Sequence, residues 1–156
     1  MQTDDDKKTE SLNGYKEGEA PVVKTVLTWQ KDLIFIGATG QGFEIKLDPH
    51  AADACKPMEA LLLSLAGCMG IDIVMILKKM RVPLTGLKMD LSGERNQTPP
   101  QYFKRIEMVL HVKGNNLDPR KIDRAIALSH EKYCSVYHSL RSDMNVDIRC
   151  LLEDQE

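Results

Sequence analysis

The chain has 156 residues, of which 42% are hydrophobic and 28% are charged, with 21 Lys and Arg against 23 Asp and Glu. This composition is ordinary for a globular protein and excludes collagen-like, low-complexity and wholly disordered classes. The net charge of −2, with both signs interleaved along the chain, provides no basic surface for a phosphate backbone or an anionic membrane. We therefore expect neither a nucleic-acid nor a membrane partner.

The cysteine content bears on the compartment. Four cysteines are too sparse for a disulfide framework, and no two of them have the Cys-x-x-Cys spacing of a zinc ribbon or a thioredoxin-type site. The first residues, MQTDDDKK, lack the apolar segment of a secretory signal. The sequence predicts a cytoplasmic protein with reduced thiols.

The first third of the chain changes character after about residue 20. Residues 1–20 are too polar to offset the entropy of ordering and are expected to form a disordered or extended tail, with residues 21–156 as a single domain. Short β-branched and aromatic runs at 22–29, 33–38 and 43–47 then predict three antiparallel strands in a meander.

A long apolar segment follows. Pro57 suits the first turn of a helix, and the helical spacing of apolar residues predicts one helix over 57–81. The stretch 60–77 is long enough to span a bilayer, but Asp72 near its middle favours a core helix of a soluble protein. A helix that is apolar on all sides needs more covering surface than one small domain provides, so we expect a homodimer.

The last part of the chain contains strands and helices. Alternating apolar and polar residues over 84–91 and 102–112 predict two long paired strands, and Asp118 followed by Pro119 predicts a helix start. A second helical segment is expected over 133–140 and a final strand over 146–152. This order predicts an α+β fold with antiparallel sheets around the long helix.

Two cysteines are candidates for chemistry. Cys68 lies inside the long predicted helix, where burial alone would raise its pKa and make it inert. Cys134 lies near the start of a helical segment, where unpaired N–H groups favour a thiolate. Helix position alone therefore predicts that Cys134 is the more acidic thiol, while Cys55 and Cys150 are most simply structural.

The spacing of His130, Cys134 and His138 raises the question of a metal site. These residues would share one face if a single helix ran through all three. Three ligands on consecutive turns span about 11 to 12 Å, which is too far for one ion about 2 Å from each. At most an adjacent pair such as Cys134 and His138 could bind zinc, and we expect no metal and no cofactor.

Two motifs make a recognisable set. The segment PMEALLLSLAGC over 57–68, followed by YCSV over 133–136, resembles the OsmC/Ohr family of osmotically inducible and organic hydroperoxide resistance proteins. The resemblance is greatest to a less characterised OsmC-like branch with Pro-Met-Glu in the first motif, and it covers residues 22–153. It implies an OsmC-like α+β fold and an intertwined homodimer, with long central helices packed together and two active sites at the subunit interface.

The resemblance also implies a chemistry. Cys68 corresponds to a peroxidatic thiolate that attacks an organic hydroperoxide, and Cys134 to a thiol that then condenses with it to a disulfide. A dithiol reductant, such as a lipoyl protein, or a small thiol would restore the pair.

Active members of the family hold the thiolate with an arginine and a glutamate. In this chain no arginine precedes Arg81, and Lys31 offers a point charge without the guanidinium fork. The family's glutamate aligns with Met58, and Glu59 lies one residue later. The candidate catalytic residues are thus Cys68, Cys134 and Glu59.

The first hypothesis is a thiol-dependent peroxidase or related redox protein of the stress response. The alternative is a non-enzymatic OsmC-like dimer that binds a small apolar ligand in the interface cleft. Loss of activity on replacing the cysteines supports the first hypothesis, whereas a co-purifying ligand and indifference to the cysteines support the second.

Overall fold

The structure, a computed structural model, describes residues 22–154. The predicted tail at 1–20 lies outside the described residues. The chain divides after Pro57 into two compact units, and each is described by itself. The expectation that residues 21–156 form a single domain stays a prediction.

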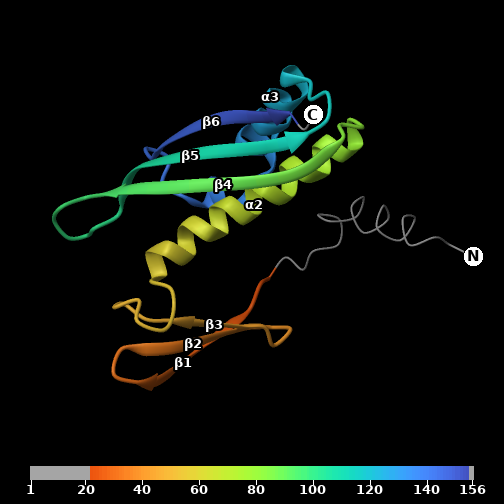
Figure 1. The fold of residues 1–156 in the computed structure, drawn as a ribbon. Coiled ribbons are helices and arrows are strands. Elements are labelled where there is room, and N and C mark those ends of the chain that lie inside the picture. Colours follow the sequence, from red (N-terminus) through yellow and green to blue (C-terminus); the bar gives the residue numbers. More distant parts are fainter. Residues whose placement is uncertain (1–21, 155–156) are drawn as a thin grey trace, which may run out of the picture. The chain divides into compact units, whose positions relative to one another are not determined.

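The first unit is a three-stranded antiparallel sheet of β1 (Thr25–Lys31), β2 (Ile34–Thr39) and β3 (Glu44–Leu47) in the order β1-β2-β3 (Figure 1). The predicted meander is confirmed. Leu27 and Trp29 are two residues apart on β1, so their side chains lie on the same face of the sheet, where they are 58% and 63% exposed. Within this unit, one face of the sheet is therefore an uncovered apolar surface.

The second unit begins with a long helix and contains a second sheet. Its elements are α2 (Pro57–Lys79), β4 (Leu84–Arg95), β5 (Phe103–Gly114), α3 (Pro119–Leu128), the π-helix η1 (Ser129–Tyr133), α4 (Ser135–Ser139) and β6 (Asn145–Asp154). The predicted start of α3 is confirmed, because the Asp118 side chain accepts the N–H of Arg120 and Pro119 occupies the first helical position.

The second sheet has the order β4-β5-β6. β4 and β5 are antiparallel, as predicted, but β6 pairs with β5 in parallel, so the expectation of purely antiparallel pairing was wrong. A parallel neighbour needs a crossover connection of a dozen or more residues, and α3, η1 and α4 supply it. The α+β class itself is confirmed.

The core of the second unit lies between this sheet and its helices, with α2 and α3 on the same side of the sheet in Figure 1. Alternate residues of β5 point into the core, and Ile106, Met108, Leu110 and Val112 are fully buried. They form one apolar cluster with buried residues of α2 and α3, namely Leu65, Met69, Ile73, Leu77, Ile122 and Ala125.

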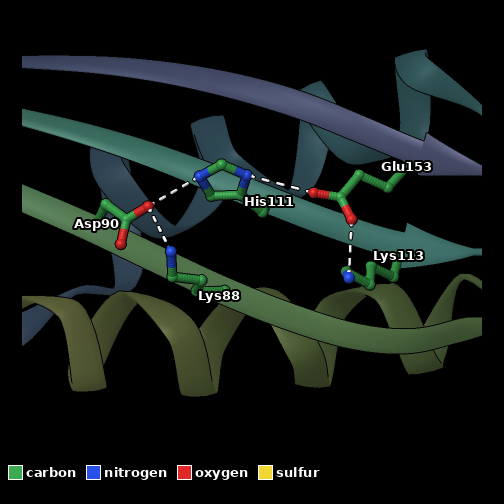
Figure 2. Close-up of polar contacts among 5 residues, drawn as sticks. All are labelled: Lys88, Asp90, His111, Lys113 and Glu153. Atoms are coloured by element: carbon green, nitrogen blue, oxygen red, sulfur yellow. Dashed lines mark hydrogen bonds and ion pairs between the residues drawn. The ribbon is translucent and has the colours of Figure 1, made fainter.

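The opposite face of the sheet is polar. His111 on β5 lies between two carboxylates, with Nε2 2.9 Å from an Asp90 oxygen and Nδ1 3.4 Å from a Glu153 oxygen (Figure 2). Lys88 pairs with Asp90 and Lys113 pairs with Glu153, each at 2.9 Å. The hydrogen bond from Lys88 is the chief cause that lowers the pKa of Asp90, and the hydrogen bond from Lys113 is the chief cause that lowers the pKa of Glu153.

Helix α2 is long and apolar enough to cross a membrane by length and composition. Its inner side is buried, and Asp72 is only 2% exposed. On another side Leu63 and Ile71 remain 65% and 44% exposed. Within its own unit, α2 is therefore a core helix with one uncovered apolar stripe.

Candidate thiol site

The two motif cysteines meet in the second unit. Cys68 lies on α2, Cys134 lies between η1 and α4, and their side chains are hydrogen-bonded to each other. Neither cysteine forms a disulfide. The structure thus brings together two thiols that are far apart in sequence, in the reduced state.

The backbone around Cys134 fixes the position of its thiol. The N–H of Cys134 donates to the carbonyl of Ser129 at 2.8 Å, which closes the π-helix η1. Cys134 then turns to an extended conformation and caps α4, with its Sγ accepting the N–H of Tyr137 at 3.3 Å. Single π-turns of this kind are common at functional sites.

Burial governs the acidity of Cys134. The side chain is completely buried, and this raises the pKa of the thiol from 9.0 to about 11. The hydrogen bond to Cys68 and the charges of Cys68 and Asp72 act in the same direction, while the N–H of Tyr137 lowers the pKa. The expectation that Cys134 is an acidic thiol because it starts a helix was wrong, since desolvation outweighs one N–H donor.

A buried carboxylate lies beside the pair. Asp72, one turn after Cys68 on α2, accepts a hydrogen bond from the Ser129 hydroxyl at 3.0 Å. Both residues are buried, Asp72 at 2% exposure and Ser129 at 0%. The Asp72 carboxyl therefore has a polar partner within its own chain. Sequence reasoning missed Ser129, and no local signal distinguishes it from any other helical serine.

Cys68 is the more accessible of the two thiols. The Cys68 side chain is half-buried on α2, whereas the Cys134 side chain is completely buried. Gly67, the residue before Cys68, faces open space. Within the single chain, Cys68 is therefore the thiol with the more exposed surroundings.

Glu59 does not join the pair within the chain. It lies in the exposed first turn of α2, nine residues before Cys68, which is roughly 13 Å of helix rise and half a turn around the axis. Any contact of Glu59 with a thiol of this site needs a second subunit, and its catalytic role stays a prediction.

The His130, Cys134 and His138 set does not lie on one helix. The extended backbone at Cys134 separates η1 from α4. His130 packs its ring against Tyr137 with centroids 4.2 Å apart, and burial lowers its pKa. Within residues 22–154, no group of three or more His, Cys, Asp or Glu side chains is arranged to hold a metal ion.

Comparison with known proteins gives a consistent family. Residues 50–149 match the family described as OsmC-like protein. The chain is 36% identical over 119 residues to Protein YhfA of Escherichia coli strain K12, covering 76% of this chain and 89% of that protein.

Solved structures share the fold. A hypothetical protein from Aquifex aeolicus VF5 superposes with a TM-score of 0.80 at 29% identity, covering 88% of this chain and 100% of that one. The organic hydroperoxide resistance protein OhrB of Bacillus subtilis superposes with a TM-score of 0.56 at 19% identity, covering 85% and 98%. The second likeness concerns the fold alone.

Proposed function

Because the chain belongs to the OsmC-like protein family, we propose that it is a thiol-dependent peroxidase that reduces organic hydroperoxides through Cys68 and Cys134. The observation that carries this proposal is the hydrogen-bonded contact of the two thiols. Two structural neighbours that share the fold are named organic hydroperoxide resistance proteins, and the proposal assigns this activity to the present chain.

The reaction follows from the different environments of the two sulfurs. The half-buried Cys68, as a thiolate, attacks the terminal oxygen of the hydroperoxide. The O–O bond breaks, the alkoxide takes up a proton and leaves as an alcohol, and Cys68 becomes a sulfenic acid.

Cys134 then completes the half-cycle. Its raised pKa keeps it protonated at neutral pH, so it does not compete for the peroxide. The Cys134 sulfur attacks the sulfenic sulfur, its proton leaves with the hydroxyl as water, and a disulfide forms. A dithiol of the cytoplasm reduces this disulfide and returns both thiols.

We include a homodimer in the proposal. Proteins of this family are soluble, so α2 is a core helix rather than a membrane span. The uncovered stripe with Leu63 and Ile71, and the exposed apolar face of the first sheet, are surfaces that a second copy can cover. Glu59 is assigned to the site of the partner subunit. Sedimentation that shows a stable monomer at micromolar concentration would contradict the homodimer and, with it, the assignment of Glu59 to the partner's site.

The test is oxidation of the reduced protein with cumene hydroperoxide, followed by peptide mass spectrometry. We expect one intramolecular disulfide joining Cys68 and Cys134. Cys68→Ser abolishes peroxide consumption, while Cys134→Ser permits a single turnover and leaves a sulfenic acid that dimedone traps.

The matched controls are Cys55→Ser and Cys150→Ser, which leave both motif cysteines in place and should retain full turnover. Absence of the Cys68–Cys134 linkage after oxidation, or turnover that survives Cys68→Ser, contradicts the proposal.

A further inference from the structure

A second feature of the same unit lies outside the thiol site. A cavity of about 420 Å³ opens between the first turns of α2, the loop that joins β4 to β5, and the segment after α4. Met58 and Leu61 line it from α2, and Met144 lines it from the segment before β6. Neither Cys68 nor Cys134 is part of its wall. Its volume lies in the range of small-molecule sites.

Two guanidinium groups stand among these apolar side chains. Arg141 lies over the ring of Tyr102, 4.0 Å from its centroid, and forms a two-pronged ion pair with Asp143 at 2.6 and 2.9 Å. This pairing raises the pKa of Arg141 and lowers that of Asp143. The charge of Arg141 is therefore already balanced.

Arg95 is different. Its Nε donates to the carbonyl of Gln101 at 2.8 Å, which fixes the guanidinium at the cavity wall. In the part of the chain that the structure describes, no carboxylate forms an ion pair with Arg95. The neighbouring Glu94 pairs with Lys104 instead, at 3.1 Å. Among the described residues, Arg95 is thus the arginine of the wall whose charge has no carboxylate partner.

The loop that presents Arg95 is itself held in place. Asn96 donates its backbone N–H to the carbonyl of Tyr102 at 2.8 Å, and its side chain donates to the carbonyl of Thr98 at 2.8 Å. An oriented arginine on an internally bonded loop loses little conformational freedom when it binds an anion.

We propose that this cavity binds an amphipathic monocarboxylate, with the carboxylate on the Arg95 guanidinium and the alkyl chain among Met58, Leu61 and Met144. One fixed guanidinium fork matches one carboxylate, and the methionine thioethers adapt to an alkyl chain of variable shape. A neutral or cationic lipid lacks the partner that Arg95 requires. The proposal uses neither cysteine, so binding is measured without peroxide turnover.

The test is a titration of the intact protein, labelled with ¹³C at its methionine methyl groups, with decanoate below its micellar concentration. Saturable shifts are expected at Met58 and Met144, with Met75 and Met108 unmoved. Arg95→Gln should weaken binding by roughly tenfold or more, because it removes a charge-assisted two-pronged contact. Arg95→Lys, which keeps the charge without the fork, should recover part of the affinity.

The matched control is Arg124→Gln, which removes an exposed arginine of α3 away from the cavity and should leave the affinity unchanged. Methyl decanoate, without the charge, and acetate, without the chain, should both bind far more weakly than decanoate. The proposal is overturned if no saturable shift occurs, if the shifts centre on Met75, or if decanoate binds Arg95→Gln as tightly as the parent chain.

Discussion

The acidity of Cys134 offers a sharp test of how burial and local structure compete. The pKa of the thiol rises from 9.0 to about 11, with desolvation as the largest cause. This rise in the pKa means that, at neutral pH, the thiolate fraction of Cys134 is about a hundredfold smaller than that of an ordinary cysteine. In the Cys68→Ser variant, which keeps the burial but removes the neighbouring thiol, Cys134 should still react far more slowly with iodoacetamide than in the urea-unfolded chain.

Slow reaction alone does not separate poor access from a raised pKa, so the assay is the pH dependence of the rate. Hindered access lowers the rate of the iodoacetamide reaction by the same factor at every pH. The rate then still levels off at a pH just above the ordinary pKa of a thiol. A raised pKa moves the plateau, so the rate should keep climbing about tenfold per pH unit beyond pH 9. Peptide mass spectrometry reports Cys134 separately from Cys55 and Cys150. A plateau at or below pH 9 would refute the argument from burial.

Three further predictions concern stability. Ser129→Ala leaves the buried Asp72 carboxylate without its hydroxyl donor and should lower the free energy of unfolding by about 2 kcal/mol in urea titrations, whereas an unchanged midpoint would contradict the contact. Asp118→Ala removes the N-cap of α3 and should cost about 1 kcal/mol in the same assay, with Asp118→Asn as the conservative control that retains most of it. Asp90 and Glu153 have lowered pKa values in the folded state, so their stabilisation is present above their ordinary values of 3.8 and 4.5 and is lost as the pH falls through the folded values. The melting temperature of the parent chain should therefore drop on acidification more than that of a variant with both carboxyls changed to amides, and equal slopes would contradict this.

Elements marked by local signals were predicted well from the sequence. The meander over 22–47 is set by β-branched runs and turn residues, and α2 is set by its spacing and by Pro57. The start of α3 follows from Asp118 and Pro119 alone. Each of these signals acts over a few residues, so the tertiary structure had little opportunity to override it.

Features that depend on the assembled fold were not predictable in this way. The direction of β6 follows from the crossover through α3 and α4, whose path over the sheet is not encoded in the strand's own alternation. The break between η1 and α4 at Cys134 has no sequence signature. The position of Arg95 in a cavity wall could not be predicted from the sequence either, because residues distant in sequence form that wall.

Asp72 connects the sequence argument with the site. In the sequence it is the residue that separates a core helix from a membrane span, because a carboxylate in mid-helix needs a polar partner. In the structure that partner is the hydroxyl of Ser129, whose carbonyl also accepts the N–H of Cys134. One serine therefore bonds the buried Asp72 carboxyl with its side chain and accepts the N–H of Cys134 with its backbone. Ser129 therefore joins the segment that carries Cys134 to α2, at a position one turn after Cys68.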